Sequence, residues 1–239
     1  MLLPDLIARG RRPLAALVAA LLLPLWSASA IAEPGREAEP QSDKAREADE
    51  WQPLFNGRNL DGWQVTDFGG QGEVFVENGE VVISQGADLS GIHTDKKLPV
   101  LNYEIQYEAQ RAAGGDFFAG LTFPVGTSSC SLINGGWGGG VCGLSSLDGM
   151  DASENETTTY QQFDKGVWYR FRVLVTDQRI QAWINEMQIV DVETKDRRIS
   201  VRFEVEKSRP LGFSTWRTTG RIRNARIRAL PENAPSEKP

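Results

Sequence analysis

LNYEIQYEA, residues 101–109, is the clearest indication of fold class in this chain. Its odd positions from Tyr103 to Ala109 are apolar or aromatic, and its even positions from Asn102 to Glu108 are polar. Successive side chains of a β-strand point to opposite faces, so a period of two predicts a strand with one buried face.

Similar patterns extend outward from this strand in both directions. Asn78-Gly79 lies between two β-branched runs in EVFVENGEVVIS (residues 73–84), which is typical of a hairpin with a type I′ turn. A second hairpin is predicted around Asn185-Glu186. Residues 200–206 (SVRFEVE) alternate, with Val201, Phe203 and Val205 predicted to face inward. Further strands are predicted at residues 117–123, 131–133, 140–144, 167–176, 180–184, 189–192, 211–216 and 222–230.

These segments predict an all-β protein. Short strands separated by turn signals are typical of a sandwich or jelly roll. We find no internal repeat, and no amphipathic helix is indicated beyond the N-terminal region. The predicted domain covers residues 51–230, followed by a loose tail at 231–239.

The N-terminal 30 residues have the pattern of a signal peptide. Three arginines at 9, 11 and 12 precede an apolar run of 13 residues, 14–26, and Ala28 and Ala30 suit cleavage. A bilayer-spanning helix needs about 20 apolar residues, so a cleaved signal is favoured over an anchor. No later segment is long and apolar enough to cross a membrane. We therefore expect a periplasmic or secreted protein.

The distribution of charged residues limits the classes of partner that the protein is expected to bind. Residues 33–50 contain seven acidic and three basic side chains and almost nothing apolar, which predicts a flexible acidic linker over 31–50. Residues 51–239 carry 24 acidic and 20 basic side chains. Nucleic-acid binding needs a basic surface, so a nucleic-acid partner is not expected.

The two cysteines, Cys130 and Cys142, allow two interpretations. An even number in an exported protein favours a disulfide. The alternative is a pair of buried free thiols.

Residues 116–159 form the most unusual stretch of the chain. Trp137 stands between Gly135-Gly136 and Gly138-Gly139-Gly140, so its indole is predicted to be presented to a ligand such as the apolar face of a pyranose; the alternative is a core tryptophan. Trp216 and Arg217 follow a predicted strand end, where Arg217 could hold a sugar hydroxyl or a carboxylate, or the two could simply pack at the rim. Asn134 completes the predicted substrate-binding set.

Three carboxylates at regular spacing follow the glycines. Asp148, Asp151 and Glu154 could bind Ca²⁺, which takes clustered carboxylates. They could instead act on a glycosidic bond, which usually needs two carboxyls about 5–10 Å apart. The third interpretation is a solvated loop, where such residues are common.

Several blocks of the chain resemble one known family. They are LFNGRNLDGW (54–63), VENGEVVIS (76–84), residues 98–123, GVWYRFRVLV (166–175), IQAWINEMQIVDV (180–192), LGFSTWR (211–217) and RIRNARIRAL (221–230). Together they resemble the 3-keto-disaccharide hydrolase domain family. The resemblance implies a concanavalin A-like jelly roll of two antiparallel sheets in an exported bacterial protein that acts on glycosides. It also implies a sugar bound on the concave sheet face.

The middle of the chain departs from the family pattern, at residues 131–157 and at STWRTTG (214–220). Two hypotheses follow. The first is a hydrolase in which Asp116, which the resemblance places near the concave face, acts with Asp148 or Glu154 as the acid–base pair. The second is a non-catalytic carbohydrate-binding or structural module, because a fold alone does not determine function.

Overall fold

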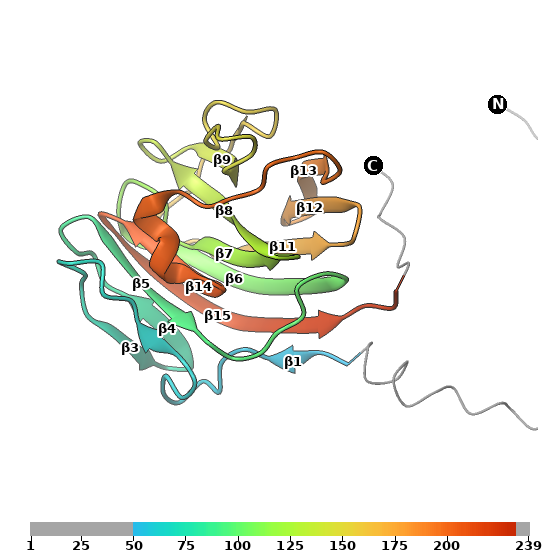
Figure 1. Cartoon of the computed structure of the whole chain (residues 1–239). Helices are drawn as coiled ribbons and strands as arrows, with labels where there is room; N and C mark the ends of the chain where they lie inside the picture. Colours follow the sequence, from blue (N-terminus) through green and yellow to red (C-terminus); the bar gives the residue numbers. More distant parts are fainter. Residues whose placement is uncertain (1–49, 233–239) are drawn as a thin grey trace, which may run out of the picture. The chain divides into compact units, whose positions relative to one another are not determined.

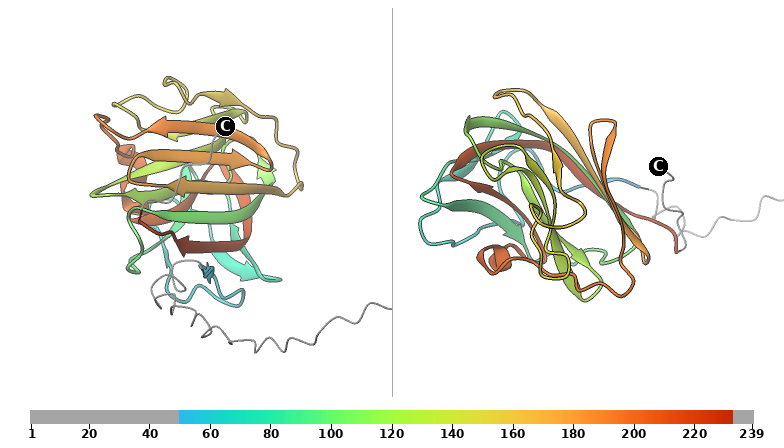
Figure 2. Two further views of the ribbon diagram at one scale, coloured as in Figure 1. Left: turned by 90° about the vertical axis from the view of Figure 1, so that its right-hand side faces the viewer. Right: turned by 90° about the horizontal axis from the view of Figure 1, so that it is seen from above.

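The computed structural model of the protein describes residues 50–232. Within this range, two antiparallel β-sheets pack face to face (Figure 1, Figure 2). The predicted signal peptide, nearly all of the predicted linker and most of the predicted tail lie outside the described residues. No helix among residues 50–232 is long and apolar enough to span a membrane.

The first layer is an eight-stranded sheet. Its strands, in spatial order, are β13 (Met187–Glu193), β12 (Arg179–Ile184), β11 (Tyr169–Val175), β6 (Tyr103–Gly114), β15 (Thr218–Ala229), β4 (Glu80–Ile83) and β3 (Val74–Glu77), with β1 (Gln52–Pro53) beside β15.

The second layer is a seven-stranded sheet. Its order is β10 (Thr159–Tyr160), β9 (Val141–Ser145), β8 (Ser128–Gly136), β7 (Gly120–Val125), β14 (Leu211–Trp216), β5 (Leu89–Thr94) and β2 (Gln64–Val65). The prediction of an all-β jelly roll with two antiparallel sheets is confirmed.

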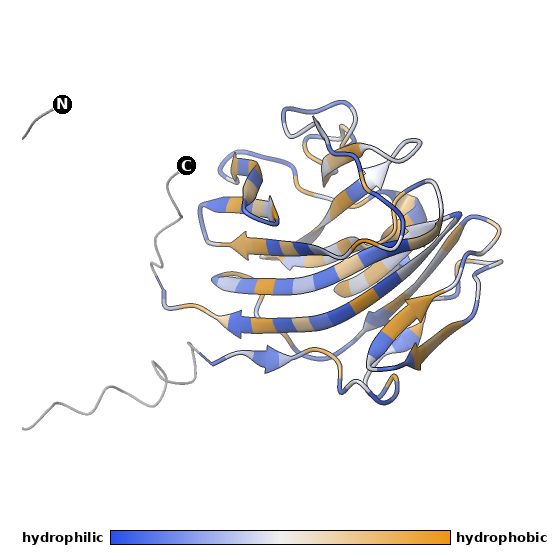
Figure 3. Ribbon diagram, turned by 180° about the vertical axis from the view of Figure 1, so that it is seen from behind, coloured by the Kyte–Doolittle hydropathy of each residue, from blue (hydrophilic) through white to orange (hydrophobic). Residues whose placement is uncertain are grey.

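The core lies between the two sheets and follows the period of two. Tyr103, Ile105 and Tyr107 of β6 are fully buried, and Tyr107 stacks on Phe171 of the neighbouring β11 with ring centroids 5.0 Å apart. Polar and apolar residues alternate along the long strands when the molecule is seen from behind (Figure 3). Burial of this apolar face is what holds the layers together.

Both predicted hairpins are present. Asn78 and Gly79 join β3 to β4 with φ of 53° and 83°, the left-handed values that a type I′ turn requires. Asn185 (φ 53°) begins the turn between β12 and β13, and its Oδ1 accepts the Arg170 N–H at 3.0 Å. These turns form where expected because their geometry depends on local residues only.

The prediction of a strand at residues 200–206 is wrong. Phe203–Ser208 forms a short 3₁₀ helix, η1, in which Phe203 is 84 % exposed while Val205 is buried. Helix η1 packs over the seven-stranded sheet, where a Cβ on Gly212 would come within 2.6 Å of the Ser208 carbonyl oxygen. Ser200, at the start of this segment, exchanges backbone hydrogen bonds with Ser146 at 2.8 and 3.2 Å, but the chain then turns into η1 instead of continuing as a strand.

Candidate functional site

A cavity of about 280 Å³ opens on the outward face of the seven-stranded sheet. We call it the Trp137–Trp216 cavity after the two indoles that line it. Its floor includes Ser131 and Ser145 from β8 and β9, and one wall comes from η1 and the residue before it. The lining residues are Leu89, Asp116, Phe117, Ser131, Ile133, Trp137, Ser145, Arg202, Glu204, Val205 and Trp216. Three of the residues predicted from sequence therefore meet here: Asp116, Trp137 and Trp216.

The glycine-rich turn presents Trp137 at the cavity edge. Trp137 has a φ of 48° and is 47 % exposed. Gly138 and Gly139 follow with φ of 89° and 115°, conformations that side-chain-bearing residues rarely adopt. As expected from the flanking glycines, the indole is not enclosed by its own segment.

Arg111 holds this turn from below. It is only 6 % exposed, and its guanidinium donates to the backbone carbonyls of Asp116 (3.1 Å), Gly135 (3.1 Å), Gly139 (2.9 Å) and Phe163 (3.3 Å). It also lies over the Phe118 ring, 5.1 Å from the centroid. Burial lowers the pKa of Arg111. One side chain thus ties together three backbone segments around the cavity, the turn at 135–139 and the segments at Asp116 and Phe163.

Asp116 contacts the same turn from the cavity side. Its Oδ1 accepts the Phe117 N–H at 2.8 Å and its Oδ2 accepts the Gly138 N–H at 2.9 Å. Both carboxylate oxygens are therefore engaged by backbone donors. This geometry assigns Asp116 to positioning Trp137.

An ion-pair network forms the opposite wall. Nε and Nη2 of Arg202 donate to the two carboxylate oxygens of Glu204 at 3.0 and 2.7 Å, and Nη1 donates to Asp151. Asp151 also accepts a hydrogen bond from the Ser145 hydroxyl at 3.2 Å. The hydrogen bonds from the Arg202 guanidinium lower the pKa of Glu204.

The sequence profile of the 3-keto-alpha-glucoside-1,2-lyase-like domain matches residues 50–228. The chain belongs to this family. No curated protein gives a significant match. Membership of this family indicates a carbohydrate-related domain, which is either a hydrolase or a binding module.

Solved structures share the fold at low sequence identity. The Crh5 transglycosylase in complex with NAG has a TM-score of 0.54 at 14 % identity, covering 77 % of this chain and 86 % of that one. An endo-acting O-glycanase from the human gut microbiota has a TM-score of 0.52 at 10 % identity, covering 77 % and 100 %. A Parabacteroides distasonis protein named as a glycosyl hydrolase reaches 0.49 at 17 % identity, covering 80 % and 97 %. The first two similarities show that the 3-keto-alpha-glucoside-1,2-lyase-like domain has the jelly-roll fold of these proteins.

The three predicted loop carboxylates do not gather in this family member. Asp148 pairs with Arg197 at 2.7 Å, which lowers its pKa, while Asp151 pairs with Arg202. Glu154 is exposed and accepts only the Asp151 N–H, at 3.5 Å. No group of three His, Cys, Asp or Glu side chains suited to a metal ion occurs within residues 50–232. The structure therefore gives no support to the predicted Ca²⁺ site, because each aspartate faces a different arginine.

Two further site residues were placed wrongly by the sequence. Asn134 is fully buried and faces the core, where its Nδ2 donates to the Tyr107 hydroxyl at 3.0 Å, so it does not contact a ligand in the cavity. Arg217 does not line the cavity; its Nη2 pairs with Asp88 at 2.6 Å. The Arg217 guanidinium lies over the Trp216 ring, 5.5 Å from its centroid, so these two residues pack together at the rim, which was the alternative interpretation.

The predicted disulfide is also wrong. Cys130 and Cys142 are both free and buried. Cys142 is opposite Asn134 in the β8–β9 ladder, four residues beyond Cys130. Four residues of strand extend about 13 Å, and bridged cysteines need Cα atoms within about 7 Å.

The sequence did not identify Arg111, which holds the turn beside the cavity, or the lining residues Ser131, Ser145, Arg202 and Glu204. Arg111 lies on the inward side of β6, two residues after Ala109 and four after Tyr107. A single charged residue on this otherwise apolar face could have indicated its role from sequence. Glu204 could not be identified from sequence, because its segment was predicted as a strand, whereas it forms η1 beside the cavity.

Proposed function

We propose that this domain binds a carbohydrate in the Trp137–Trp216 cavity and cleaves its glycosidic bond, with a 3-keto-α-glucoside as the substrate class. The observation that supports this most directly is that two indoles and two carboxylates, Asp116 and Glu204, line one cavity in a member of this family. Exposed indole faces suit the apolar face of a pyranose ring. The hydroxyl groups of Ser131 and Ser145 offer hydrogen bonds to sugar hydroxyls.

The chemistry of a 3-keto sugar needs little from the protein beyond a positioned base. The ketone at C3 makes the proton on C2 acidic. A base removes this proton, the electron pair forms a C1–C2 double bond, and the bond from C1 to the glycosidic oxygen breaks. The departing oxygen takes a proton from water.

Glu204 is the carboxylate that we assign to this base. Its position on the cavity wall is fixed by two hydrogen bonds from Arg202. The same arginine lowers its pKa, so Glu204 is a weaker base than an unpaired glutamate. Asp116 is assigned to positioning, since its Oδ2 accepts the N–H of Gly138, directly beside Trp137, and so holds the turn that presents the indole.

Turnover of a 3-keto-α-glucosyl disaccharide by the purified full-length protein tests the proposal. A positioned general base contributes at least about 10²-fold, so Glu204→Gln is expected to lower kcat by about that factor. The exposed Glu154, which does not line the cavity, provides the control substitution Glu154→Gln, expected to leave kcat unchanged. A Glu204→Gln variant with full turnover would exclude this assignment.

A second candidate is a non-catalytic carbohydrate-binding module. It is favoured by the observation that both cavity carboxylates are already engaged, Asp116 with two backbone donors and Glu204 with Arg202. In that case the wild-type protein binds the same disaccharide without turnover, and Trp137→Ala weakens binding. Product formation by the wild-type protein decides between the two candidates.

A further inference from the structure

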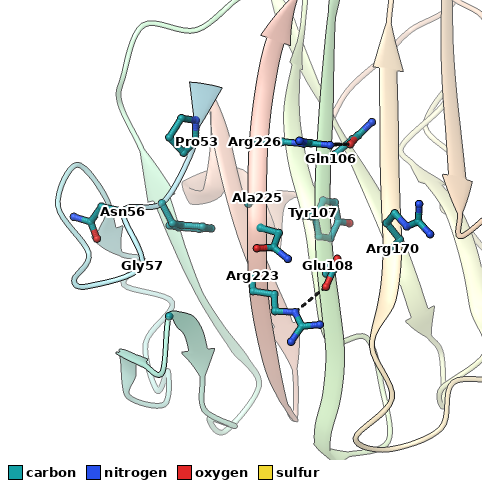
Figure 4. Close-up of a pocket in the computed structure, with 13 residues that line it drawn as sticks. Pro53, Asn56, Gly57, Gln106, Tyr107, Glu108, Arg170, Arg223, Ala225 and Arg226 are labelled. Carbon is teal, nitrogen blue, oxygen red and sulfur yellow. Dashed lines mark hydrogen bonds and ion pairs between the residues drawn. The ribbon is translucent and has the colours of Figure 1, made fainter. Parts of the chain in front are cut away.

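A second cavity, of about 460 Å³, lies on the outward face of the eight-stranded sheet (Figure 4). Because it is on the other sheet, the core separates it from the Trp137–Trp216 cavity. Three arginines line it, Arg170, Arg223 and Arg226, with one carboxylate, Glu108. The lining is thus basic in a chain whose net charge is −6.

The cavity sits at a gap in the sheet. Strand β15 pairs with β4 as far as Ile222 and with β1 from Arg226 onward. Between these two neighbours, residues 223–225 have no strand partner on that edge, although the Ala225 carbonyl accepts the Leu54 N–H at 2.9 Å. Backbone polar groups at such an edge are open to a ligand.

A β-bulge in β15 aims the arginines at this gap. The register against β6 shifts between Arg223 and Arg226, and Asn224 in the bulge has a φ of 53°. The extra residue lets Ile222, Ala225 and Ile227 all face the core. Arg223 and Arg226 consequently share the outward face, one on each side of the bulge. Bulges often re-aim side chains next to functional sites.

Stacking on tryptophans holds both guanidinium groups in place. Arg223 lies over the Trp168 ring at 3.9 Å, and its Nε donates to Glu108 at 2.7 Å. Arg226 lies over the Trp51 ring at 4.4 Å, and its Nε and Nη2 donate to the Gln106 Oε1. Within residues 50–232, Nη2 of Arg223 and Nη1 of Arg226 have no protein acceptor.

Arg170 reaches the cavity from β11, across β6 (Figure 4). Its side chain is 62 % exposed, and its ion-pair partner is Glu186 at 3.4 Å, itself 87 % exposed. Exposed pairs of this kind contribute little, so a ligand can replace Glu186 at small cost.

We propose that this cavity is a second ligand site, which binds an acidic saccharide through the guanidinium groups of Arg170, Arg223 and Arg226. A planar guanidinium matches the geometry of a carboxylate or sulfate group better than any other side chain. The exposed amide of Asn224 and the unpaired edge of β15 then face the sugar hydroxyls. The cavity volume falls within the range of about 300–1,000 Å³ typical of small-molecule sites.

Calorimetric titration of the full-length protein tests this inference. The probes are a galacturonic acid trisaccharide, its neutral methyl ester, a sulfated galactose trisaccharide and inorganic sulfate. We expect at least one acidic trisaccharide to bind, and the methyl ester to bind at least about tenfold more weakly, the factor for one lost hydrogen bond to a charged group. Comparison of the galacturonic acid trisaccharide with the sulfated galactose trisaccharide shows whether the cavity recognises a carboxylate or a sulfate group.

Substitutions locate the site. Arg170→Gln is expected to raise the Kd for the acidic trisaccharide about tenfold. Arg209→Gln is the matched control, because Arg209 also has a single ion-pair partner (Glu206) but lies beside η1 on the other sheet. Trp216→Ala is expected to leave this binding unchanged, which separates it from the function proposed for the first cavity.

Four results would overturn the inference. They are the absence of binding by both acidic trisaccharides, equal binding of the neutral ester, equal binding of inorganic sulfate, and loss of acidic-saccharide binding in Trp216→Ala without loss in Arg170→Gln.

Discussion

The buried side chain of Asn134 shows how a polar group is held inside the sandwich, although its Oδ1 has no hydrogen-bond partner among the described residues. The Asn134 amide donates to the Tyr107 hydroxyl at 3.0 Å, and that hydroxyl donates to the Ala119 carbonyl at 3.3 Å. Burial raises the pKa of Tyr107, so the phenol stays neutral and keeps its proton for this bond. A predicted ligand contact thus turns out to be part of a core hydrogen-bond chain, which stabilises the packing of the two sheets.

The two thiols provide the prediction at this scale. Burial raises the pKa of Cys130 to about 12 and that of Cys142 to about 11. Both thiols are therefore protonated at pH 8 and should react with Ellman's reagent only after denaturation, giving two thiols per chain. Rapid labelling of the native protein, or no labelling after unfolding, would contradict the structure.

The raised pKa values of the two thiols also make the free energy of unfolding depend on pH. Unfolded thiols ionise at their ordinary pKa near 9, whereas the buried thiols keep their protons to higher pH. Their contribution to the free energy of unfolding is therefore complete below about pH 9 and is lost as the pH rises toward 11–12.

At the scale of elements, the turn between β8 and β9 depends on a side chain from a different strand. The turn carries Trp137 and several left-handed glycines, whose backbone is costly to order. Arg111 of β6 offsets this cost by donating to carbonyls on both sides of Trp137. The position of the indole is thus a property of the contact between two elements.

Replacing Arg111 should loosen this turn. In Arg111→Met, four backbone carbonyls, two of them in fully buried hydrogen bonds, lose this donor, and we expect the free energy of unfolding to fall by about 3 kcal/mol. Arg111→Lys should recover only part of this, because an ammonium lacks the planar fork. Urea denaturation gives the stability, and hydrogen exchange at residues 135–140 should be faster in both variants.

The exposed Arg209 provides the control for that experiment. Arg209→Met removes one exposed ion pair and should change stability by less than about 1 kcal/mol. If Arg111→Met were equally neutral, Arg111 would have no role in holding the turn.

At the scale of the whole molecule, the spacing of the two sheets is set partly by a residue without a side chain. Gly220 of β15 lies where the sheets approach closely, and a Cβ there would fall 1.9 Å from the Phe118 carbonyl oxygen and 3.1 Å from the Thr215 methyl. Thr215 belongs to β14 of the opposite sheet. Any side chain at position 220 must therefore push the layers apart.

Gly220→Ala should destabilise the protein by about 3 kcal/mol, the upper range for overpacking. Gly115→Ala is the matched control, since a methyl group added there would meet nothing within 4 Å and its φ is not left-handed, so a change below about 0.5 kcal/mol is expected. Urea midpoints at equal m-values provide the comparison. Equal stability of the two variants would show that the sheets can separate at no cost.

Much of the fold could be predicted because its signals are local. The alternation of residues 103–109 and the Asn78-Gly79 turn depend on strand geometry and backbone conformation within a few residues. Residues 200–206 show the limit of this approach. Their alternation suits a strand, but a strand also needs a partner, and the seven-stranded sheet leaves this segment lying across its outer face.

The candidate site was predictable only in part for the same reason. Trp137 was found because its flanking glycines are adjacent in sequence, whereas Glu204 and Arg111 join the site from segments that are distant along the chain. The pairing of Asp148 and Asp151 with Arg197 and Arg202 likewise depends on contacts across about 50 residues.

The amino-acid sequence was sufficient for the all-β class, the hairpins, the family and the presentation of Trp137, because each depends on short-range backbone preference or on matched motifs. The three-dimensional arrangement was needed to establish which carboxylates share a cavity, that the cysteines are too far apart along their ladder to bridge, and that a bulge places two arginines on one face. The physical reason is that register and layer packing bring together residues whose separation in sequence carries no information about their distance in space.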